Sequence, residues 1–197
     1  MTNTCSSTLR KTLRQKRQAL TPQQQNQHAL AARDHLLKSS LLKNSRKIAL
    51  FLSQDGELGT DALIQSLWQH EEFEVYLPAL ETLPDWHMGF SRYHSDTLLI
   101  PNQFKIPEPD IPLGQHLPGT EMDLVIMPLV GFDVEGNRMG MGGGYYDRTF
   151  EFKLSNKALR PKLVGWAHSC QQVEQLNAEP WDVPLDAIVT EKGIIEF

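Results

Sequence analysis

The residues with the clearest chemical potential are Arg138–Asp147, which read RMGMGGGYYD. Four of these ten residues are glycines, namely Gly140, Gly142, Gly143 and Gly144. Glycine has no Cβ, so a glycine run can turn several backbone N–H groups toward one point and form a nest for an anion such as phosphate. A helix that begins at the last glycines would add its unpaired N–H groups and its positive dipole end. The stretch therefore predicts a phosphate-binding loop.

The side chains around the glycines suit phosphate and metal chemistry. Arg138 can hold phosphate oxygens with its forked guanidinium, and Asp147 offers a carboxylate of the kind that binds Mg²⁺ together with phosphate oxygens and waters. Tyr145 and Tyr146 have rings that can stack on a ligand or close a pocket. The dinucleotide fingerprint would need a glycine at Tyr145 or Asp147, and the P-loop needs a following Gly-Lys-Ser/Thr, so neither motif fits. The alternative is a surface turn or a hairpin tip.

A buried strand is predicted immediately before the glycines. Leu124–Phe132 is an almost unbroken apolar run, which suits a strand covered on both faces, although a buried helix has a similar pattern. Pro128 lies inside the run, so we expect the strand to end near Met127. Gly136-Asn137 then marks a turn. The predicted order is strand, turn, glycine loop and helix, which places the loop where open α/β sheets bind ligands.

The segment from Pro128 to Arg148, PLVGFDVEGNRMGMGGGYYDR, resembles the signature of the 5-formyltetrahydrofolate cyclo-ligase family. Some family members carry Arg and Lys between the glycines, where this chain has Met141 and Gly143. The resemblance extends over about residues 6 to 190. It implies a single-domain α/β fold, a three-layer sandwich with a mostly parallel sheet and helices on both faces. It also implies the ATP- and Mg²⁺-dependent cyclisation of 5-formyltetrahydrofolate to 5,10-methenyltetrahydrofolate, with release of ADP and phosphate.

The resemblance assigns roles to the residues at matching positions. The residues implied to bind ATP are Ser6, Arg10, Lys11, Arg138, Gly140, Gly142, Gly143, Gly144, Tyr145 and Tyr146. The residues implied to bind the folate are Leu52, Glu57, Phe104 and Tyr145. Asp147 and Asp186 are implied to hold Mg²⁺. Arg138, Tyr145 and Asp147 are implied to act in catalysis.

Two of these residues also have a plain structural interpretation. Glu57 follows a predicted strand, where a solvated loop acid is common. Phe104 lies in a proline-rich loop of about twenty residues, Ile100–Thr120, which is long for a compact domain and predicts a lid or a pocket wall. In that loop Phe104 either packs on the pterin ring, as the family resemblance implies, or anchors the loop to the core.

A strongly basic helix is predicted at residues 6–20, capped by Ser6 or Ser7. Its cations either face solvent or supply positive charge to the glycine loop. The family has a Lys-x-x-Leu-Arg motif near its start that contributes to ATP binding. Alignment on Arg17 places the motif's arginine on Arg10 and its lysine on Ser6, so Lys11 is the candidate that compensates.

The remaining chain predicts alternating strands and helices. A second helix is expected from its N-cap Thr21 to about Lys38. Further strands are expected at residues 47–53, 73–78, 85–93, 161–167, 187–190 and 193–197, and further helices at residues 60–69, with Thr60 as the cap, and 144–154. His28 and His35 have no second ligand at a matching spacing, and we interpret them as surface or cap residues. Ser169 follows His168 directly, and adjacent residues seldom form a nucleophile and base pair.

Composition narrows the class of protein. The chain has 197 residues, 40% of them hydrophobic and 22% charged, which suits one domain with a sizeable core. Its net charge of −5 argues against nucleic-acid binding by bulk charge. The sequence lacks a secretory signal and any membrane-length apolar run, so we expect a cytoplasmic monomer with Cys5 and Cys170 as free thiols. Two alternative functions stay open: another ATP-dependent small-molecule ligase or kinase, and a non-enzymatic nucleotide- or folate-binding module.

Overall fold

The computed structural model describes residues 2–80, 82–112 and 114–197. Within these residues the core is an eight-stranded sheet in the order β12-β11-β10-β7-β1-β2-β3-β6. Its five central strands are parallel, and they are β11 (Ala187–Thr190), β10 (Lys162–Trp166), β7 (Leu124–Met127), β1 (Lys47–Ala49) and β2 (Glu74–Ala79). Antiparallel strands complete both sides: β12 (Gly193–Glu196), β3 (Gly89–Arg92) and β6 (Leu117–Pro118).

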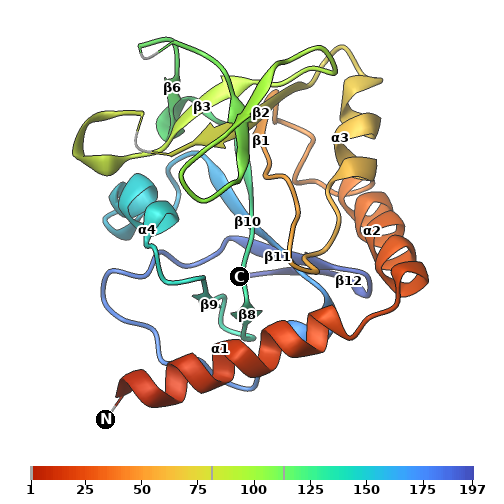
Figure 1. Cartoon of the computed structure of the whole chain (residues 1–197), viewed down its shortest axis with the longest axis vertical. Coiled ribbons are helices and arrows are strands. Elements are labelled where there is room, and N and C mark those ends of the chain that lie inside the picture. Colours follow the sequence, from red (N-terminus) through yellow and green to blue (C-terminus); the bar gives the residue numbers. More distant parts are fainter. Residues whose placement is uncertain (1, 81, 113) are drawn as a thin grey trace.

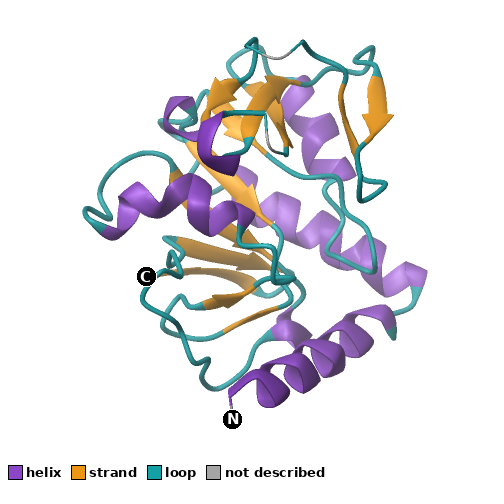
Figure 2. Ribbon diagram, turned by 60° about the vertical axis from the view of Figure 1, so that its left-hand side comes forward, coloured by secondary structure: helices purple, strands orange, loops and turns teal. Residues whose placement is uncertain are grey.

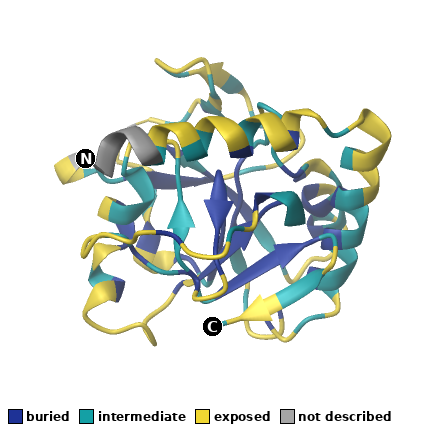
Figure 3. Cartoon of the chain, turned by 90° about the horizontal axis from the view of Figure 1, so that it is seen from below, coloured by how far each residue is buried: buried dark blue, intermediate teal, exposed yellow. Residues whose placement is uncertain are grey.

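Side chains of the parallel strands alternate between two apolar clusters, one on each face of the sheet. In β7, Leu124 and Ile126 belong to one cluster, whereas Val125 and Met127 belong to the other. All four are buried, which explains why the sequence of this strand is continuously apolar. Figure 3 shows the central strands in dark blue inside more exposed elements.

Helices cover both faces of the sheet (Figure 2). On one face lie α2 (Pro22–Leu37) and α3 (Asp61–Trp68), whose buried residues join the cluster of Leu124. On the other face lies α4 (Tyr145–Phe150), which continues as a 3₁₀ turn, η3 (Glu151–Leu154). This is the three-layer α/β sandwich with a mostly parallel sheet that the family resemblance implies.

The first helix, α1 (Thr2–Gln18), lies across the carboxyl ends of the parallel strands (Figure 1). Arg17 near its end donates to the carbonyls of Asp55, which follows β1, and Leu129, which follows β7. The helix also packs on η4 (Ser169–Gln171), which follows β10. The prediction that Ser6 or Ser7 caps this helix is wrong, because the helix already begins at Thr2 and no Gly or Pro interrupts the preceding turn.

The second helix follows its predicted start closely. Thr21 is its N-cap and forms a reciprocal capping box with Gln24, and Pro22 occupies the first turn. Thr60 also occupies the N-cap position of α3, but its hydroxyl donates to the carbonyl of Phe51 and not to the helix. The predicted cap bond of Thr60 is therefore wrong, although the boundary is right.

The proline-rich segment is more ordered than predicted. Instead of one loop it contains a small hairpin of β4 (Leu99–Pro101) and β5 (Pro107–Pro109), together with β6 and the 3₁₀ turn η2 (Gly119–Glu121). Prolines fit here because these strands are short and pair on one side only. A second hairpin, β8 (Gly131–Phe132) with β9 (Arg138–Met139), separates β7 from the glycine loop.

Five strands are shorter or shifted relative to their predictions, two of them, β10 and β12, by only one residue at one or both ends. The strand expected at residues 47–53 ends at Ala49, and the one at 73–78 runs from Glu74 to Ala79. The one expected at residues 85–93 begins only at Gly89, because a 3₁₀ turn, η1 (Pro84–Trp86), precedes it and Asp85 has a φ of 58°.

Two further sequence expectations concern thiols and membranes. Cys170 is a free cysteine, whereas the side chain of Cys5 lies outside the described part of the chain. Among the described residues, no helix has both the length and the apolar character that a membrane span requires.

Candidate functional site

The glycine loop joins β9 to α4 at the carboxyl side of the sheet. Gly142 has a φ of 103° and Gly144 a φ of 65°, values that favour glycine. A Cβ on Gly142 would meet no atom within 4 Å, so backbone conformation and not crowding calls for glycine there. Gly144 is the N-cap of α4 and offers no side chain to the first N–H groups of the helix. The loop thus has backbone conformations that favour glycine, as the predicted phosphate-binding loop requires.

Arg138 is buried beside this loop and has unused hydrogen-bonding capacity. Its side chain is 5% exposed, and its Nη2 donates to Asp147 Oδ1 at 2.6 Å. Within the described residues its Nε has no hydrogen-bond partner. A buried guanidinium N–H without a partner is costly and needs an explanation such as a missing ligand. A phosphate oxygen is the natural acceptor for such a group.

The basic helix faces the glycine loop with one side. Arg10 Nε donates to the carbonyl of Gly140 at 2.9 Å, and Ser6 is half-buried one turn earlier on the same helix face. Lys11 points elsewhere and is exposed. The interpretation of α1 as a helix that brings charge to the loop is therefore supported by Arg10, and Lys11 lies on the side of the helix that faces solvent.

Arg17 and Asp55, which the sequence reasoning did not assign to the site, connect its parts. Arg17 is 1% exposed; its Nη2 lies 2.9 Å from Asp55 Oδ2 and its Nη1 3.6 Å from Glu57 Oε1. Asp55 also pairs with Arg14 at 2.8 Å, and this hydrogen bond lowers the pKa of Asp55. In the sequence Arg17 looks like any other cation of the basic helix. Its spacing from Arg10 and Arg14, which puts the three on one face, was the available signal.

Glu57 is a mostly buried carboxyl group. Its Oε2 accepts from the N–H of Gln54, and the side chain is 11% exposed. Burial raises the pKa of Glu57, against the hydrogen bond from Gln54 and the charge of Arg17. The interpretation of Glu57 as a solvated loop acid is therefore wrong, and the group is placed as a binding-site carboxyl would be.

Tyr146 feels the charges of two predicted site residues, Glu57 in the loop after β1 and Arg138 beside the glycine loop. The residue is half-buried, and its ring stacks on Phe150 with centroids 6.4 Å apart. Burial raises the pKa of Tyr146, the charge of Glu57 adds to this, and the charge of Arg138 opposes it. The hydroxyl therefore lies within electrostatic reach of a predicted folate residue and a predicted ATP residue. Leu52 is half-buried and packs against the α2–α3 side of the core.

An aromatic pair forms between two segments that are far apart in the sequence. Phe104, between β4 and β5, meets Tyr145 edge to face with ring centroids 6.2 Å apart. The guanidinium of Arg148 lies over the other ring of this pair, 5.1 Å from the centroid of Tyr145. Phe104 is 54% exposed, so its interpretation as a core anchor is wrong. The exposed ring is available to a flat ligand.

Asp186 has contacts that do not suit the predicted metal role. It precedes β11, so it lies at the amino edge of the parallel strands, opposite the loops that carry Asp55 and Glu57. Its Oδ2 accepts from the N–H of Leu163 at 2.7 Å and lies 3.3 Å from the ammonium of Lys153, which is buried. If Asp186 turned toward a metal ion instead, the buried ammonium of Lys153 would lose its counter-charge. The contacts of Asp186 therefore argue against its sharing Mg²⁺ with Asp147.

The histidines differ from their predicted surroundings. Ser169 Oγ donates to Glu191 and not to His168, so the two adjacent residues do not form a nucleophile pair. His28, however, is not a simple surface residue, because its Nδ1 lies 2.9 Å from Nδ1 of the buried His168. Burial lowers the pKa of His168 to about 4. Sequence spacing could not reveal this pair, since the two rings come from elements 140 residues apart.

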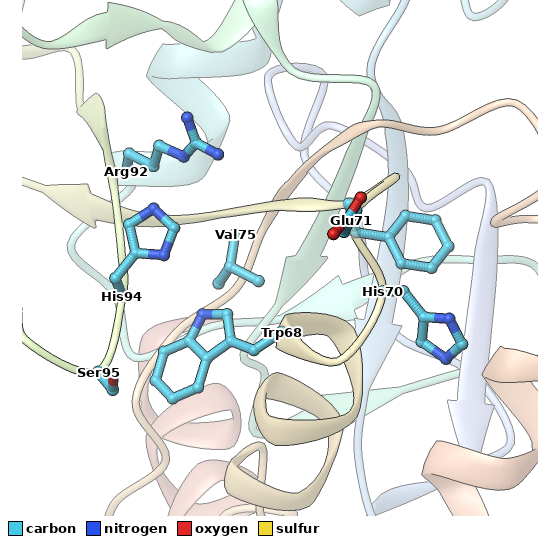
Figure 4. Close-up of a pocket in the computed structure, with 8 residues that line it drawn as sticks. Trp68, His70, Glu71, Val75, Arg92, His94 and Ser95 are labelled. Carbon is cyan, nitrogen blue, oxygen red and sulfur yellow. The ribbon is translucent and has the colours of Figure 1, made fainter.

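A separate cavity lies at the opposite edge of the sheet (Figure 4). It has a volume of about 400 Å³ and is lined by residues of the α3 end, the β2 start and the β3 end, including Trp68, Phe73 and Arg92. Because β2 is parallel to β1, its amino end faces away from the glycine loop. This cavity contains none of the predicted site residues.

Comparisons with known proteins identify the family of this chain. The model of the 5-formyltetrahydrofolate cyclo-ligase family matches residues 3–191. The 5-formyltetrahydrofolate cyclo-ligase of Haemophilus influenzae is 45% identical over 177 residues, which are 90% of this chain and 92% of that protein. Its counterpart in Escherichia coli K12 is 40% identical over 185 residues, 94% of this chain and all of that protein.

Solved structures agree as well. The NMR structure of Aquifex aeolicus 5,10-methenyltetrahydrofolate synthetase superposes with a TM-score of 0.80 at 32% identity, covering 97% of this chain and 92% of that one. The synthetase of Mycoplasma pneumoniae superposes with a TM-score of 0.69 at 25% identity, covering 94% and 98% of the two chains. With the family model spanning nearly its whole length and relatives at this level of identity, the chain belongs to the 5-formyltetrahydrofolate cyclo-ligase family.

Proposed function

We propose that this protein cyclises 5-formyltetrahydrofolate to 5,10-methenyltetrahydrofolate, using ATP and Mg²⁺ and releasing ADP and phosphate. The observation that carries the proposal is the buried Arg138 at the glycine loop, held by Asp147 and with its Nε lacking a partner among the described residues. That arrangement offers a forked cation and a backbone nest to the same phosphate group. Family membership supplies the folate as the acceptor of the phosphoryl group.

The residues near the loop suit the phosphate side of this reaction. Arg138, Arg10 and the glycine N–H groups would bind the phosphates and offset negative charge as the γ-phosphoryl moves. Gly140 and Gly143 contribute through the backbone of the loop, alongside Gly142 and Gly144. Ser6 lies on the same helix face as Arg10, and Lys11 would act only through the more distant field of the helix.

Asp147 fits a magnesium ligand. It is a carboxylate beside the phosphate nest, and its Oδ1 is held by Arg138 and by the N–H of Val183. Among the described residues its Oδ2 has no hydrogen-bond partner. Magnesium commonly uses one protein carboxylate together with phosphate oxygens and waters, and it would neutralise charge on the phosphates. Asp186 is not needed for such a site.

The folate side is formed by the residues on the other loops. Phe104 and Tyr145 would pack on the pterin ring, Leu52 would add apolar contact, and Glu57 would bond a polar group of the substrate. The formyl oxygen attacks the γ-phosphoryl and ADP leaves, which activates the formyl carbon as an iminium phosphate. Nitrogen 10 then attacks that carbon, the ring closes and phosphate departs. The chain thus acts by positioning and by electrostatics, and needs no protein nucleophile.

The broader assignments follow from the same proposal. We infer that the 197 residues form one cyclo-ligase domain, working as a cytoplasmic monomer on a small-molecule folate, without nucleic acid or membrane partners. The net charge of −5 supports this, since it opposes binding to nucleic acid.

The test is absorbance near the methenyl-folate band, recorded with protein, Mg²⁺, ATP and 5-formyltetrahydrofolate. We expect growth that requires ATP and falls by at least about a hundredfold in Asp147→Ala. Asp96→Ala, which removes an exposed carboxylate elsewhere, serves as the matched control and should keep full activity. Absence of growth from a folded protein that binds ATP would rule out the cyclo-ligase reaction and direct the search to other acceptors.

A further inference from the structure

Three potential metal ligands converge outside the proposed ATP and folate sites. His28 comes from α2, His168 follows β10, and Glu191 follows β11. One ligand atom of each lies within 4.8 Å of those of the other two. We propose that these three side chains form a binding site for a divalent transition metal of the zinc type.

The distances fit one shared ion. His28 Nδ1 is 2.9 Å from His168 Nδ1 and 3.8 Å from Glu191 Oε2. In tetrahedral zinc sites, nitrogens at about 2.0–2.1 Å from the metal lie roughly 3.3 Å from each other. To bind one ion, the two imidazoles would move apart by about 0.4 Å from their hydrogen-bonded separation and turn so that both Nδ1 lone pairs point at it.

The donor types select the class of metal. Two imidazole nitrogens and one carboxylate form a set that zinc uses, with a water in the fourth position. Magnesium and calcium prefer oxygen ligands alone. The site is therefore chemically distinct from the carboxylate Asp147, which suits magnesium at the phosphate loop.

The second ring nitrogen of His168 is compatible with metal binding at the first. The residue is fully buried, and its Nε2 has no hydrogen-bond partner among the described residues. A metal on Nδ1 would place the ring proton on Nε2, as in ordinary metal-bound histidines whose second nitrogen faces a backbone carbonyl. The backbone of Gly56 lies near this ring.

The third ligand is already oriented. Glu191 accepts a hydrogen bond from the N–H of Ser169 at 2.9 Å on Oε2 and another from its hydroxyl on Oε1. Such contacts from outside the ligand set fix a carboxylate for metal binding. The side chain of His28 is 22% exposed, which gives an ion a route from solvent. In Figure 1, α2 lies beside the β11–β12 pair that carries Glu191.

Titration of the chelator-treated full-length protein with Co²⁺ tests the proposal. Excess Mg²⁺ is present and ATP is absent, so that Co²⁺ does not occupy the phosphate loop. We expect one equivalent to bind with the visible absorption of a low-coordinate cobalt site, and Zn²⁺ to displace it. His28→Ala should weaken binding by at least about tenfold, and its partial exposure makes it tolerable to the fold.

Two further variants make the outcome decisive. Glu191→Gln keeps the shape of the side chain and should also weaken Co²⁺ binding, whereas His94→Ala, at an exposed histidine on the far edge of the sheet, should bind like the unaltered protein. The proposal is overturned if the unaltered chain binds no Co²⁺, if His28→Ala and Glu191→Gln both bind normally, or if His94→Ala loses binding equally.

Discussion

At the scale of single residues, two arginines of the site carry the same charge but differ strongly in burial. Arg14 and Arg17 lie on the same helix and both bind Asp55 Oδ2. Arg14 is 39% exposed, whereas Arg17 is 1% exposed and also donates to the carbonyl of Leu129. Exposed ion pairs contribute little because water screens them, but a buried cation holds groups that would otherwise lack partners.

The two arginines therefore give a matched prediction. Arg17→Ala should lower the free energy of unfolding by roughly 3 kcal/mol, because it removes a buried guanidinium together with its hydrogen bonds to the carbonyls of Asp55 and Leu129 and its charge beside the mostly buried Glu57. Arg14→Ala should cost less than about 1 kcal/mol. Urea denaturation of both variants measures the difference. Equal losses would show that burial of Arg17 does not govern its contribution.

At the scale of elements, the glycine loop requires glycine for its backbone shape. Gly142 has a φ of 103°, and Gly140 does not have a positive φ. Because left-handed backbone is strained for residues with a Cβ, Gly142→Ala should destabilise the protein by about 1–2 kcal/mol and raise the KM for ATP.

Gly140→Ala is the control for this variant. Its added Cβ would meet no atom closer than Arg138 Nη1 at 3.8 Å, an ordinary contact. Thermal unfolding should therefore show a lower Tm for Gly142→Ala and a nearly unchanged Tm for Gly140→Ala. A similar drop in both would mean that crowding in the loop, and not its backbone conformation, demands the glycines.

The β4–β5 hairpin brings an aromatic ring to the site without serving the core. Since Phe104 is 54% exposed, Phe104→Ala should leave stability unchanged. Loss of its stacking should raise the KM for the folate by about tenfold, with the KM for ATP unaltered. Leu98→Ala, at a still more exposed position beside β4, should change neither constant. Steady-state kinetics with each substrate varied in turn would detect any other pattern, and a change confined to the KM for ATP would contradict the assignment.

At the scale of the whole molecule, buried carboxylates tie folding to pH. Asp133 is fully buried in the β8–β9 hairpin and accepts bonds from Glu135, Asn137 and Leu176. Burial acts to raise the pKa of Asp133, but the hydrogen bonds from Asn137 and the backbone prevail and lower it. In the unfolded chain the carboxyl group of Asp133 has a pKa of about 3.9.

The sign of the effect follows from proton binding. Below about pH 4 the unfolded chain binds a proton at Asp133 that the folded chain does not, so stability falls as the pH drops toward the folded-state pKa. Asp133→Asn should cost about 2 kcal/mol at pH 7, and its deficit against the unaltered protein should shrink below about pH 4. Urea unfolding at pH 7 and pH 3.5 measures this. A deficit that stays constant with pH would show that another group carries the dependence.

The elements that local sequence determines were predicted well. The strand Leu124–Met127 was predicted to its last residue, because both its faces are covered and every side chain is apolar. The start of α2 at Thr21 and Pro22 follows from capping chemistry within one turn. The glycine loop was recognised because positive φ angles, found here at Gly142 and Gly144, favour glycine itself.

The sequence alone could not determine which distant segments contact one another. Burial of Arg17, the contact of Phe104 with Tyr145, and the meeting of His28, His168 and Glu191 all depend on which strand ends share an edge of the sheet. Strand order also places Asp186 at the opposite edge, where it pairs with Lys153, and its metal role stays a prediction. Hydrophobic periodicity and helix-capping residues report only on the local structure within a few residues of a position. A site assembled from several loops depends instead on how the whole chain packs.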